Sequence, residues 1–230
     1  MKPINGGLII FVLLLASACS KPFYQSNDFN EQTAAHQTVA IIPVQMVFNG
    51  SPLGSLSGED KTMVEEAESK AFQISLFREL LYSANGKKSL KVTLMPVEQT
   101  NNKLEKANIS IRESWDMMPN ELADILGVDA VIKTTVYKKR YLTDLASYGI
   151  NISSKVLALL TKGRSLLALG TGNKIDKTNS ITAHCSLYNE QDGQVLWSMS
   201  LQDDTDWKKP TNEVIDDINR QFAKHFPYRK

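Results

Sequence analysis

Two alternating apolar segments around a turn constrain the fold of this chain more than any other feature. Residues 180–202 carry apolar residues at every second position on both sides of the turn: Ile181, Ala183, Cys185 and Leu187 before it, and Val195, Trp197, Met199 and Leu201 after it. Because successive side chains of a strand point to opposite faces, each segment presents one apolar face. Asp192-Gly193 between them favours a tight turn. The pattern predicts a β-hairpin with one buried face.

Strand and helix patterns alternate upstream of this hairpin. Residues 39–47 form a nearly continuous apolar run, typical of a strand covered on both faces, although Pro43 lacks a donor for the ladder. Ser57 and Asp60 have capping-box spacing ahead of a long helix that Asn85-Gly86 ends. The apolar stripe expected on that helix consists of Met63, Ala67, Phe72, Ile74, Phe77 and Leu81.

Four more elements complete the pattern. Alternation over residues 90–94 predicts a second strand, and Pro119 and Gly127 bracket a short helix. A third strand is expected over residues 129–141, with one face apolar and the other wet or covered by polar partners. The apolar face holds Ala130, Ile132, Thr134 and Val136, and the other holds Asp129, Lys133, Tyr137 and Lys139. After an acidic loop (Asp203, Asp204, Asp206), a closing helix carries Val214, Ile218 and Phe222 and ends at Pro227.

The element order predicts the fold class. It reads β-α-β-α-β, then a helical insertion at about residues 145–175, then β-β-α. This order is typical of an α/β (α+β) sandwich with a mixed sheet of about five strands. We expect residues 38–230 to form a single domain of this kind.

The N-terminus has the pattern of a secretory signal. Lys2 precedes an uncharged apolar run over residues 8–15, which is too short to span a bilayer as a helix and narrows to small residues before Cys19. We expect residues 1–18 to be removed by cleavage between Ala18 and Cys19. The polar residues 20–37 show neither helical nor strand periodicity. They are predicted to be a flexible tether, so that residues 19–37 link the anchor to the domain.

Ala16-Ser17-Ala18-Cys19 resembles the lipobox of bacterial lipoproteins. The resemblance implies that Cys19 receives diacylglycerol on its thiol and an acyl chain on its new amine, which together hold a protein stably on a membrane. Ser20 follows the cysteine; by similarity to enterobacterial sorting, this favours the outer membrane, with the domain facing the periplasm. The alternative is an ordinary secreted protein whose cleavage site happens to hold a cysteine.

Charge and cysteine content narrow the functional classes. Without residues 1–18 the chain keeps 25 basic and 25 acidic residues, a formal charge of zero. Phosphate backbones call for a basic surface, so this balance argues against a nucleic-acid partner. The chain has two cysteines. If Cys19 carries lipid, Cys185 has no partner for an intramolecular disulfide.

Three short motifs carry a resemblance to a known group of domains. They are VAIIPV at residues 39–44, ELADILGVDAVI at 121–132 and DGQVLW at 192–197. In this order the chain resembles periplasmic lipoprotein domains related to the curli-assembly lipoprotein and to the amino-terminal domain of the Tol translocation protein. The likeness covers residues 38–140 and 178–226 and implies a shared α/β sandwich. With its C-terminal Phe-Pro-Tyr, the chain also resembles uncharacterised Bacteroidetes lipoproteins.

Candidate catalytic and metal-binding patterns are weak. His184 and Cys185 are adjacent, so on a strand they face opposite sides and cannot act as base and nucleophile; Cys185 is expected to be a core residue. The histidines show no metal-ligand spacing, the 203–206 segment lacks EF-hand positions, and residues 170–174 lack the P-loop spacing. We therefore predict no catalytic residues, no metal and no cofactor beyond the acyl groups on Cys19.

The insertion at 145–175 is the most unusual segment. It contains no acidic residue but four basic ones, together with leucine-rich runs on either side of Lys162 and Arg164. One interpretation is a pair of helices that cover a sheet face. The other is docking on a membrane or partner. In that case the contact residues would be Lys155, Lys162, Arg164 and Leu166.

These observations favour a lipid-anchored, periplasm-facing, non-catalytic binding or assembly module of the cell envelope. Its expected partners are the membrane, through the anchor, and an envelope protein or a second copy of the chain. The alternative is an oligomeric secretion-channel subunit like the curli-assembly lipoprotein, although the insertion lacks the alternation of barrel strands. An envelope hydrolase is the third hypothesis, for which the sequence offers no triad.

Overall fold

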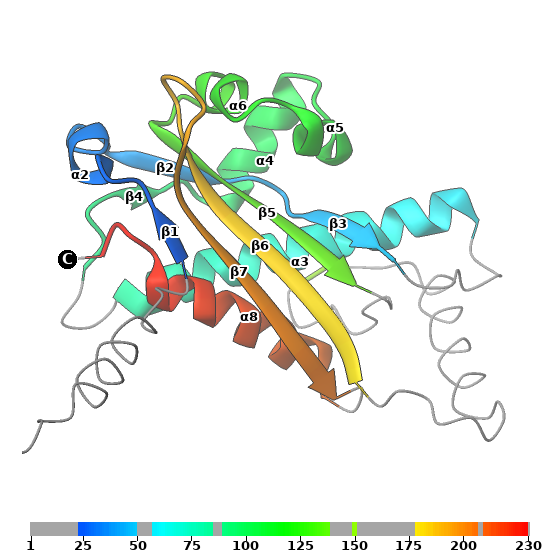
Figure 1. Cartoon of the computed structure of the whole chain (residues 1–230). Coiled ribbons are helices and arrows are strands. Elements are labelled where there is room, and N and C mark those ends of the chain that lie inside the picture. The colour runs from blue at the N-terminus through cyan, green and yellow to red at the C-terminus, as the bar shows by residue number, and fades with distance from the viewer. Residues whose placement is uncertain are drawn as a thin grey trace, which may run out of the picture.

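A mixed β-sheet with helices on both faces forms the core of the structure (Figure 1). The computed structural model describes residues 23–49, 57–84, 89–138, 149–150, 178–206 and 209–229. The sheet has seven strands in the order β1-β7-β6-β5-β2-β4, and β3 also pairs with β5. The predicted α/β (α+β) class is confirmed, with more strands than the five expected. The strands are β1 Phe23–Gln25, β2 Thr38–Ile41, β3 Gln45–Phe48, β4 Thr93–Leu94, β5 Ala130–Lys138, β6 Thr178–Asn189 and β7 Val195–Asp206.

Helices cover the two faces unequally. The helices are α2 Phe29–Gln32, α3 Gly58–Ala84, α4 Val97–Lys106, α5 Ile111–Asp116, α6 Pro119–Leu126 and α8 Thr211–His225. The long helices α3 and α8 pass behind β6 and β7 in Figure 1 and pack on the larger core. A smaller core on the other face joins α4 and α6 to β2 and β5. Within the described part of the chain, this second cover reaches one end of the sheet.

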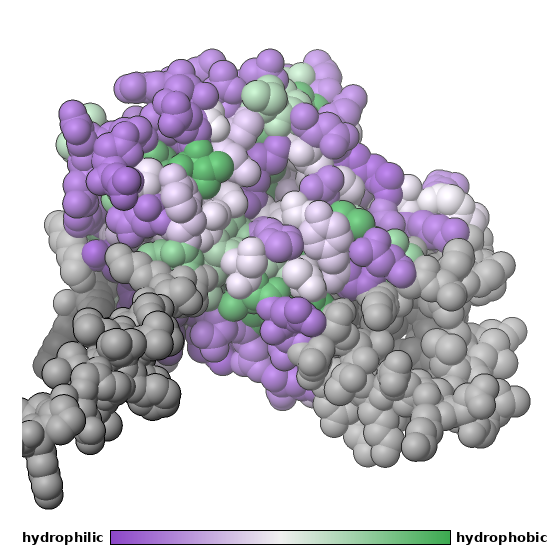
Figure 2. All heavy atoms as spheres, in the orientation of Figure 1, coloured by the Kyte–Doolittle hydropathy of each residue, from purple (hydrophilic) through white to green (hydrophobic). Residues whose placement is uncertain are grey.

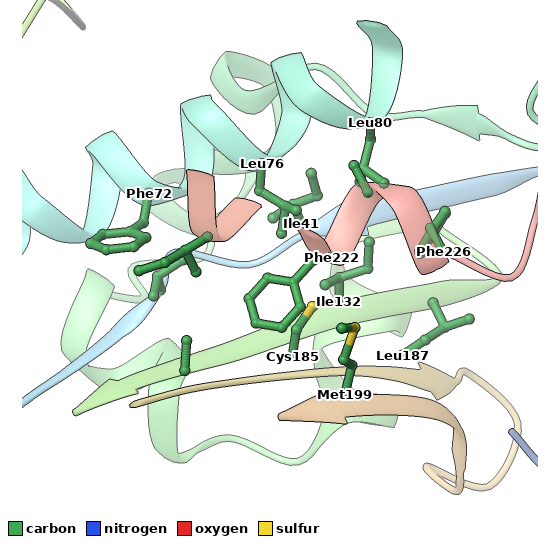
Figure 3. Packing of buried hydrophobic residues seen from close by; sticks show 14 of the residues in the cluster. Ile41, Phe72, Leu76, Leu80, Ile132, Cys185, Leu187, Met199, Phe222 and Phe226 are labelled. Atoms are coloured by element: carbon green, nitrogen blue, oxygen red, sulfur yellow. The ribbon is translucent and has the colours of Figure 1, made fainter. Parts of the chain in front are cut away.

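The larger core is built from aromatic and aliphatic side chains of both layers. Figure 3 shows Phe72, Leu76 and Leu80 of α3 and Phe222 of α8 pointing toward the strands. Cys185 and Met199 point back at them from β6 and β7. Cys185 is buried, as predicted for a core residue, and this burial raises the pKa of its thiol to about 12. The thiol is therefore an unreactive apolar packing group.

The predicted hairpin is confirmed. β6 and β7 pair antiparallel from Thr178↔Asp206 to Tyr188↔Val195, with an irregularity at Leu187/Tyr188. Gly193 has φ 67°, and the Asp192 carboxylate accepts a hydrogen bond from the Gln194 amide at 3.0 Å. The aspartates at 203, 204 and 206 are not a loop as expected, because β7 continues to Asp206. Pairing with β6 extends the strand past the point where the apolar pattern stops.

The apolar run at residues 39–47 forms two short strands, so the prediction of one strand is wrong. β2 ends at Ile41 and β3 begins at Gln45, with Pro43 between them. Proline has no amide donor for the ladder, so pairing breaks there. Both strands still run parallel to β5 along the same side.

The long helix is confirmed at α3, but its predicted stripe is only partly buried. Ser57 and Asp60 bond reciprocally at the start, as in a capping box. Met63 and Leu81 of the predicted stripe are about two-fifths exposed, with relative accessibilities of 41% and 40%. The residues that are buried in their place include Val64, Leu76 and Leu80. α3 packs against both the sheet and α8, so its buried face is wider than a single stripe.

The short helix bracketed by proline and glycine is confirmed as α6. Its C-cap, Gly127, has φ 61° and ψ 55°, a left-handed conformation that disfavours a Cβ. We expect Gly127→Ala to lower the free energy of unfolding by about 1 kcal/mol in urea titrations. Gly58→Ala is the control, since an added Cβ there has nothing within 4 Å and φ is not positive. Equal effects of the two substitutions would contradict this explanation.

Residues 23–37 are part of the fold, so the prediction of a flexible tether is wrong for this segment. β1 pairs antiparallel with β7 through Phe23↔Met199 and Gln25↔Trp197. Phe29 of α2 is 2% exposed within the larger core. These elements are too short to show periodicity, and their stability depends on partners more than 160 residues away in the chain.

Several predicted residues lie outside the described part of the chain. They are Ala18 and Cys19 at the expected cleavage site, and Lys155, Lys162, Arg164 and Leu166 of the insertion. Among the described residues, none of the helices combines the length and apolar character needed to cross a membrane.

Candidate functional site

The face of β5, β6 and β7 opposite α3 and α8 carries polar side chains in register. Three cross-strand rows can be followed through the pairing: Tyr24, Ser198, Ser186 and Lys133; Ser200, His184, Thr135 and Gln45; and Gln202, Thr182, Tyr137 and Val47. We call these twelve residues, all polar or tyrosine except Val47, the polar sheet face. Figure 2 shows this side of the molecule, where the surface over the strands is mostly pale or purple with small green areas.

Strand alternation produces this face. In β6 the odd-numbered residues 181–187 are buried under α3 and α8, which leaves Thr182, His184 and Ser186 on the opposite side. α4 and α6 cover that side only around Ala40 and Val131, and Tyr188 packs at the border of their core. The predicted wet side of the third strand is confirmed in part, since Lys133 and Tyr137 belong to this face.

Hydrogen bonds and ring contacts organise the middle of the polar sheet face. His184 Nδ1 lies 2.6 Å from Ser200 Oγ, and the Tyr137 ring meets the imidazole edge-on with ring centroids 5.6 Å apart. In the same row the Thr135 hydroxyl donates to Gln45 Oε1 at 3.0 Å. Neighbouring strands thus fix each other's side chains across the row.

At one end of the polar sheet face, backbone carbonyls bind the Lys133 ammonium, so this charge is used within the fold. Its Nζ donates to the backbone oxygens of Trp115 at 2.8 Å and Met117 at 2.7 Å. These carbonyls belong to the end of α5, which has no further turn to satisfy them. Partial burial lowers the pKa of the Lys133 ammonium, while Asp116 opposes that shift.

The His184–Ser200 pair could suggest a nucleophile and its base. Such a pair also needs a group that orients the imidazole and donors for a developing oxyanion. Among the described residues, the structure places Ser200 and the Tyr137 ring, but no carboxylate, against His184. The face offers tyrosine, serine and histidine side chains on a rigid sheet, a combination that suits recognition of another surface.

A groove of about 440 Å³ lies on the other side of α3. Glu66 and Lys70 of α3 face Asn101 and Glu105 of α4 across it, and the loop that follows α4 closes one end. Asn108 in this loop has φ 57°. The groove is therefore lined by both acidic and basic side chains.

A cluster around His36 joins the N-terminal segment to the C-terminus. His36 Nδ1 and the Tyr228 hydroxyl are 2.5 Å apart, and the Asp129 carboxylate accepts the backbone amides of Gln37 and Thr38 at 2.8 and 2.7 Å. Burial raises the pKa of Tyr228, so its hydroxyl stays protonated. Burial also lowers the pKa of His36, although the charge of Asp129 opposes the shift. The imidazole is thus held mainly neutral in the folded protein.

This pKa shift predicts a loss of stability in mild acid. Below about pH 6.5 the unfolded chain protonates His36 more readily than the folded protein does, so the free energy of unfolding falls as pH drops through that range. We expect His36→Gln to lose less stability than the wild type between pH about 7.5 and about 5.5 in urea titrations. His225, whose pKa burial also lowers, remains in both proteins as an internal control. An unchanged pH dependence would contradict the assignment.

One ion pair lies wholly inside the core. Lys138 at the end of β5 binds Glu68 of α3, and their side chains are 1% and 0% exposed. Burial lowers the pKa of Lys138, whereas the charge of Glu68 opposes the shift. Sequence reasoning missed this pair, although Lys138 follows Ala130, Ile132, Thr134 and Val136 at the next position of the same alternation. The pair is inaccessible to solvent and therefore structural.

The separation of His184 from Cys185 is confirmed: His184 is exposed and Cys185 is buried on the other side. The described residues contain no group of three or more His, Cys, Asp or Glu side chains placed to hold a metal ion. The functional site that the sequence did not identify is the polar sheet face as a whole. The sequence indicated this face only through the polar residues that alternate with apolar residues along the strands.

Comparison with known proteins gives distant structural similarities. No family model and no curated protein matches the sequence. Lipoprotein GNA1162 from Neisseria meningitidis is 13% identical over 82% of this chain and 99% of its own, with a TM-score of 0.44. A PelC dodecamer structure from Paraburkholderia phytofirmans is 11% identical over 82% and 86%, with a TM-score of 0.40. The LpoB C-terminal domain from Salmonella enterica is 13% identical over 77% and 93%, with a TM-score of 0.34. These values assign no family. The resemblance to curli-assembly and Tol domains stays a prediction.

Proposed function

We propose that this chain is a lipid-anchored, periplasm-facing, non-catalytic binding or assembly module of the bacterial envelope. Acylated Cys19 holds it to the membrane, by preference the outer membrane, and the polar sheet face contacts an envelope protein. The observation that carries the proposal is the register of that face, in which three strands align tyrosine, serine, threonine and histidine side chains in rows. Such side chains give contact area and adaptable hydrogen bonds at a small cost in conformational entropy.

The anchor has a direct test. We expect Cys19→Ala to leave an uncleaved precursor or a mislocalised protein, because both lipidation and cleavage depend on that thiol. The measurement is intact mass together with membrane fractionation of cells that express the full chain. Cys185→Ala is the matched control, since Cys185 is buried in the core. Normal processing and fractionation of the Cys19→Ala protein would refute the anchor.

The contact face is tested by photocrosslinking in intact cells. Probes replace His184 and Gln202 on the polar sheet face, and Glu98 on α4 serves as an exposed control. We expect both face probes to capture the same envelope protein, and the control probe to capture none of it. Adding Ser200→Glu should abolish capture from His184, because a charge would be buried in the contact without a partner.

Probes at Lys155, Lys162 and Leu166 separate this proposal from docking through the insertion. Capture from these positions alone, or equal capture from Glu98, would overturn the assignment of the polar sheet face. Capture of a second copy of this chain from His184 would identify self-association as the contact that the face makes.

A further inference from the structure

The short distance between Cys19 and the first strand restricts how the domain can sit on its membrane. β1 begins at Phe23, which pairs with Met199 of β7. Three residues therefore separate the acylated position from the sheet, and the four steps from Cys19 to Phe23 can span at most about 14 Å at about 3.6 Å per residue. The inference rests on the proposed acylation of Cys19. Under that condition the bilayer surface lies close to Phe23.

If the end of the β6–β7 hairpin near Asp206 pointed toward this bilayer, it would have to penetrate the bilayer. The N-terminal end of antiparallel β1 faces the same way as the C-terminal end of β7, and from Met199 β7 continues for seven residues to Asp206. At about 3.3 Å per residue this is about 23 Å, more than the anchor segment can reach. Asp203 lies near this end of β7. Carboxylates are costly in hydrocarbon and are repelled by anionic headgroups.

The edge of the sheet at β1 carries basic side chains instead. The Phe23 ring lies 5.7 Å from the ring of His225 at the end of α8. Lys224 is exposed beside it, and the Arg229 guanidinium donates to the Lys224 carbonyl at 2.6 Å. This corner thus places cationic side chains next to the strand that leads to the anchor. Anionic headgroups attract such side chains.

We propose that the bilayer holding Cys19 lies against the β1 edge and the C-terminal turn of α8, so that the sheet stands edge-on to the membrane. β4 is then the distal edge, five strand spacings or about 24 Å further out. In this orientation the polar sheet face points sideways, along the membrane plane. It would meet another protein held on the same membrane.

Depth-dependent quenching tests the orientation. The full-length, lipidated Cys185→Ala protein is bound to phosphatidylethanolamine–phosphatidylglycerol vesicles that carry nitroxide-labelled headgroups. A fluorophore is attached to one of three introduced cysteines. Lys224→Cys lies at the end of α8 beside β1, Gln202→Cys lies on β7 toward Asp206, and Glu98→Cys lies at the start of α4, just after β4. We expect the largest loss of fluorescence at position 224, less at 202 and the least at 98. The largest loss at 202 would show an end-on domain and overturn the proposal.

Two controls separate this inference from the anchor itself. Cys19→Ala should abolish vesicle binding, and persistent binding would refute the anchor. A flexible Gly/Ser segment of about 20 residues inserted between Lys21 and Pro22 should keep binding but remove the difference between the three positions. Equal quenching at all three positions in the unextended, lipidated protein would refute the orientation while leaving the anchor intact.

Discussion

Lys138→Met should be among the most destabilising single substitutions, lowering the free energy of unfolding by about 3–5 kcal/mol in urea titrations. The ammonium of Lys138 and the carboxylate of Glu68 are both buried in the core and form an ion pair there. Removing the cation takes an ion-pair partner away from a carboxylate that is shielded from water. The folded state is then destabilised either by the desolvation of this carboxylate or by the free energy needed to protonate Glu68.

The pair offers two internal controls. Lys138→Met combined with Glu68→Leu should recover most of the loss, because apolar replacements of a buried ion pair are often neutral or stabilising. Lys209→Met removes the cation of a partly exposed pair with Asp217 and should cost no more than about 1 kcal/mol. A loss of that small size for Lys138→Met would mean that the two charges are not buried together.

Phe29→Ala should lower the free energy of unfolding by about 3–5 kcal/mol, as for other buried phenylalanines. Phe29 is 2% exposed, and its ring lies 5.4 Å from that of Tyr228. The substitution leaves a cavity between the N-terminal segment and the residues after α8. Tyr24→Ala is the matched control, since Tyr24 is 54% exposed and should change stability by no more than about 0.5 kcal/mol.

The two interpretations of residues 23–37 differ sharply in this experiment. A flexible tether would make both substitutions neutral, whereas a packed segment makes only Phe29→Ala costly. The same result bears on the orientation proposed above, because a loose segment would allow the anchor to reach much further from the sheet.

Local signals were sufficient for the elements that local chemistry controls. The turn at Asp192-Gly193 and the C-cap at Gly127 both occur where the sequence places them, because a positive φ is needed at each glycine. Alternation over β6 correctly separated exposed His184 from buried Cys185. Periodicity located these elements without any knowledge of their partners.

Elements that depend on distant partners could not be predicted in this way. β1 has three residues, and its pairing with β7 becomes visible only in three dimensions. The buried face of α3 follows from its contacts with both the sheet and α8, so Met63 and Leu81 are exposed despite their helical spacing. The polar sheet face also required the register, which brings Ser200, His184 and Thr135 into one row.

Histidine footprinting tests the central claim, that the polar sheet face is occupied in the envelope. His184 is exposed, so diethylpyrocarbonate should modify it readily in the purified protein, with exposed Lys106 as the reference residue. In native membranes that hold the lipidated chain, we predict that modification of His184 falls strongly relative to Lys106. Equal modification of His184 in the two preparations would contradict the account.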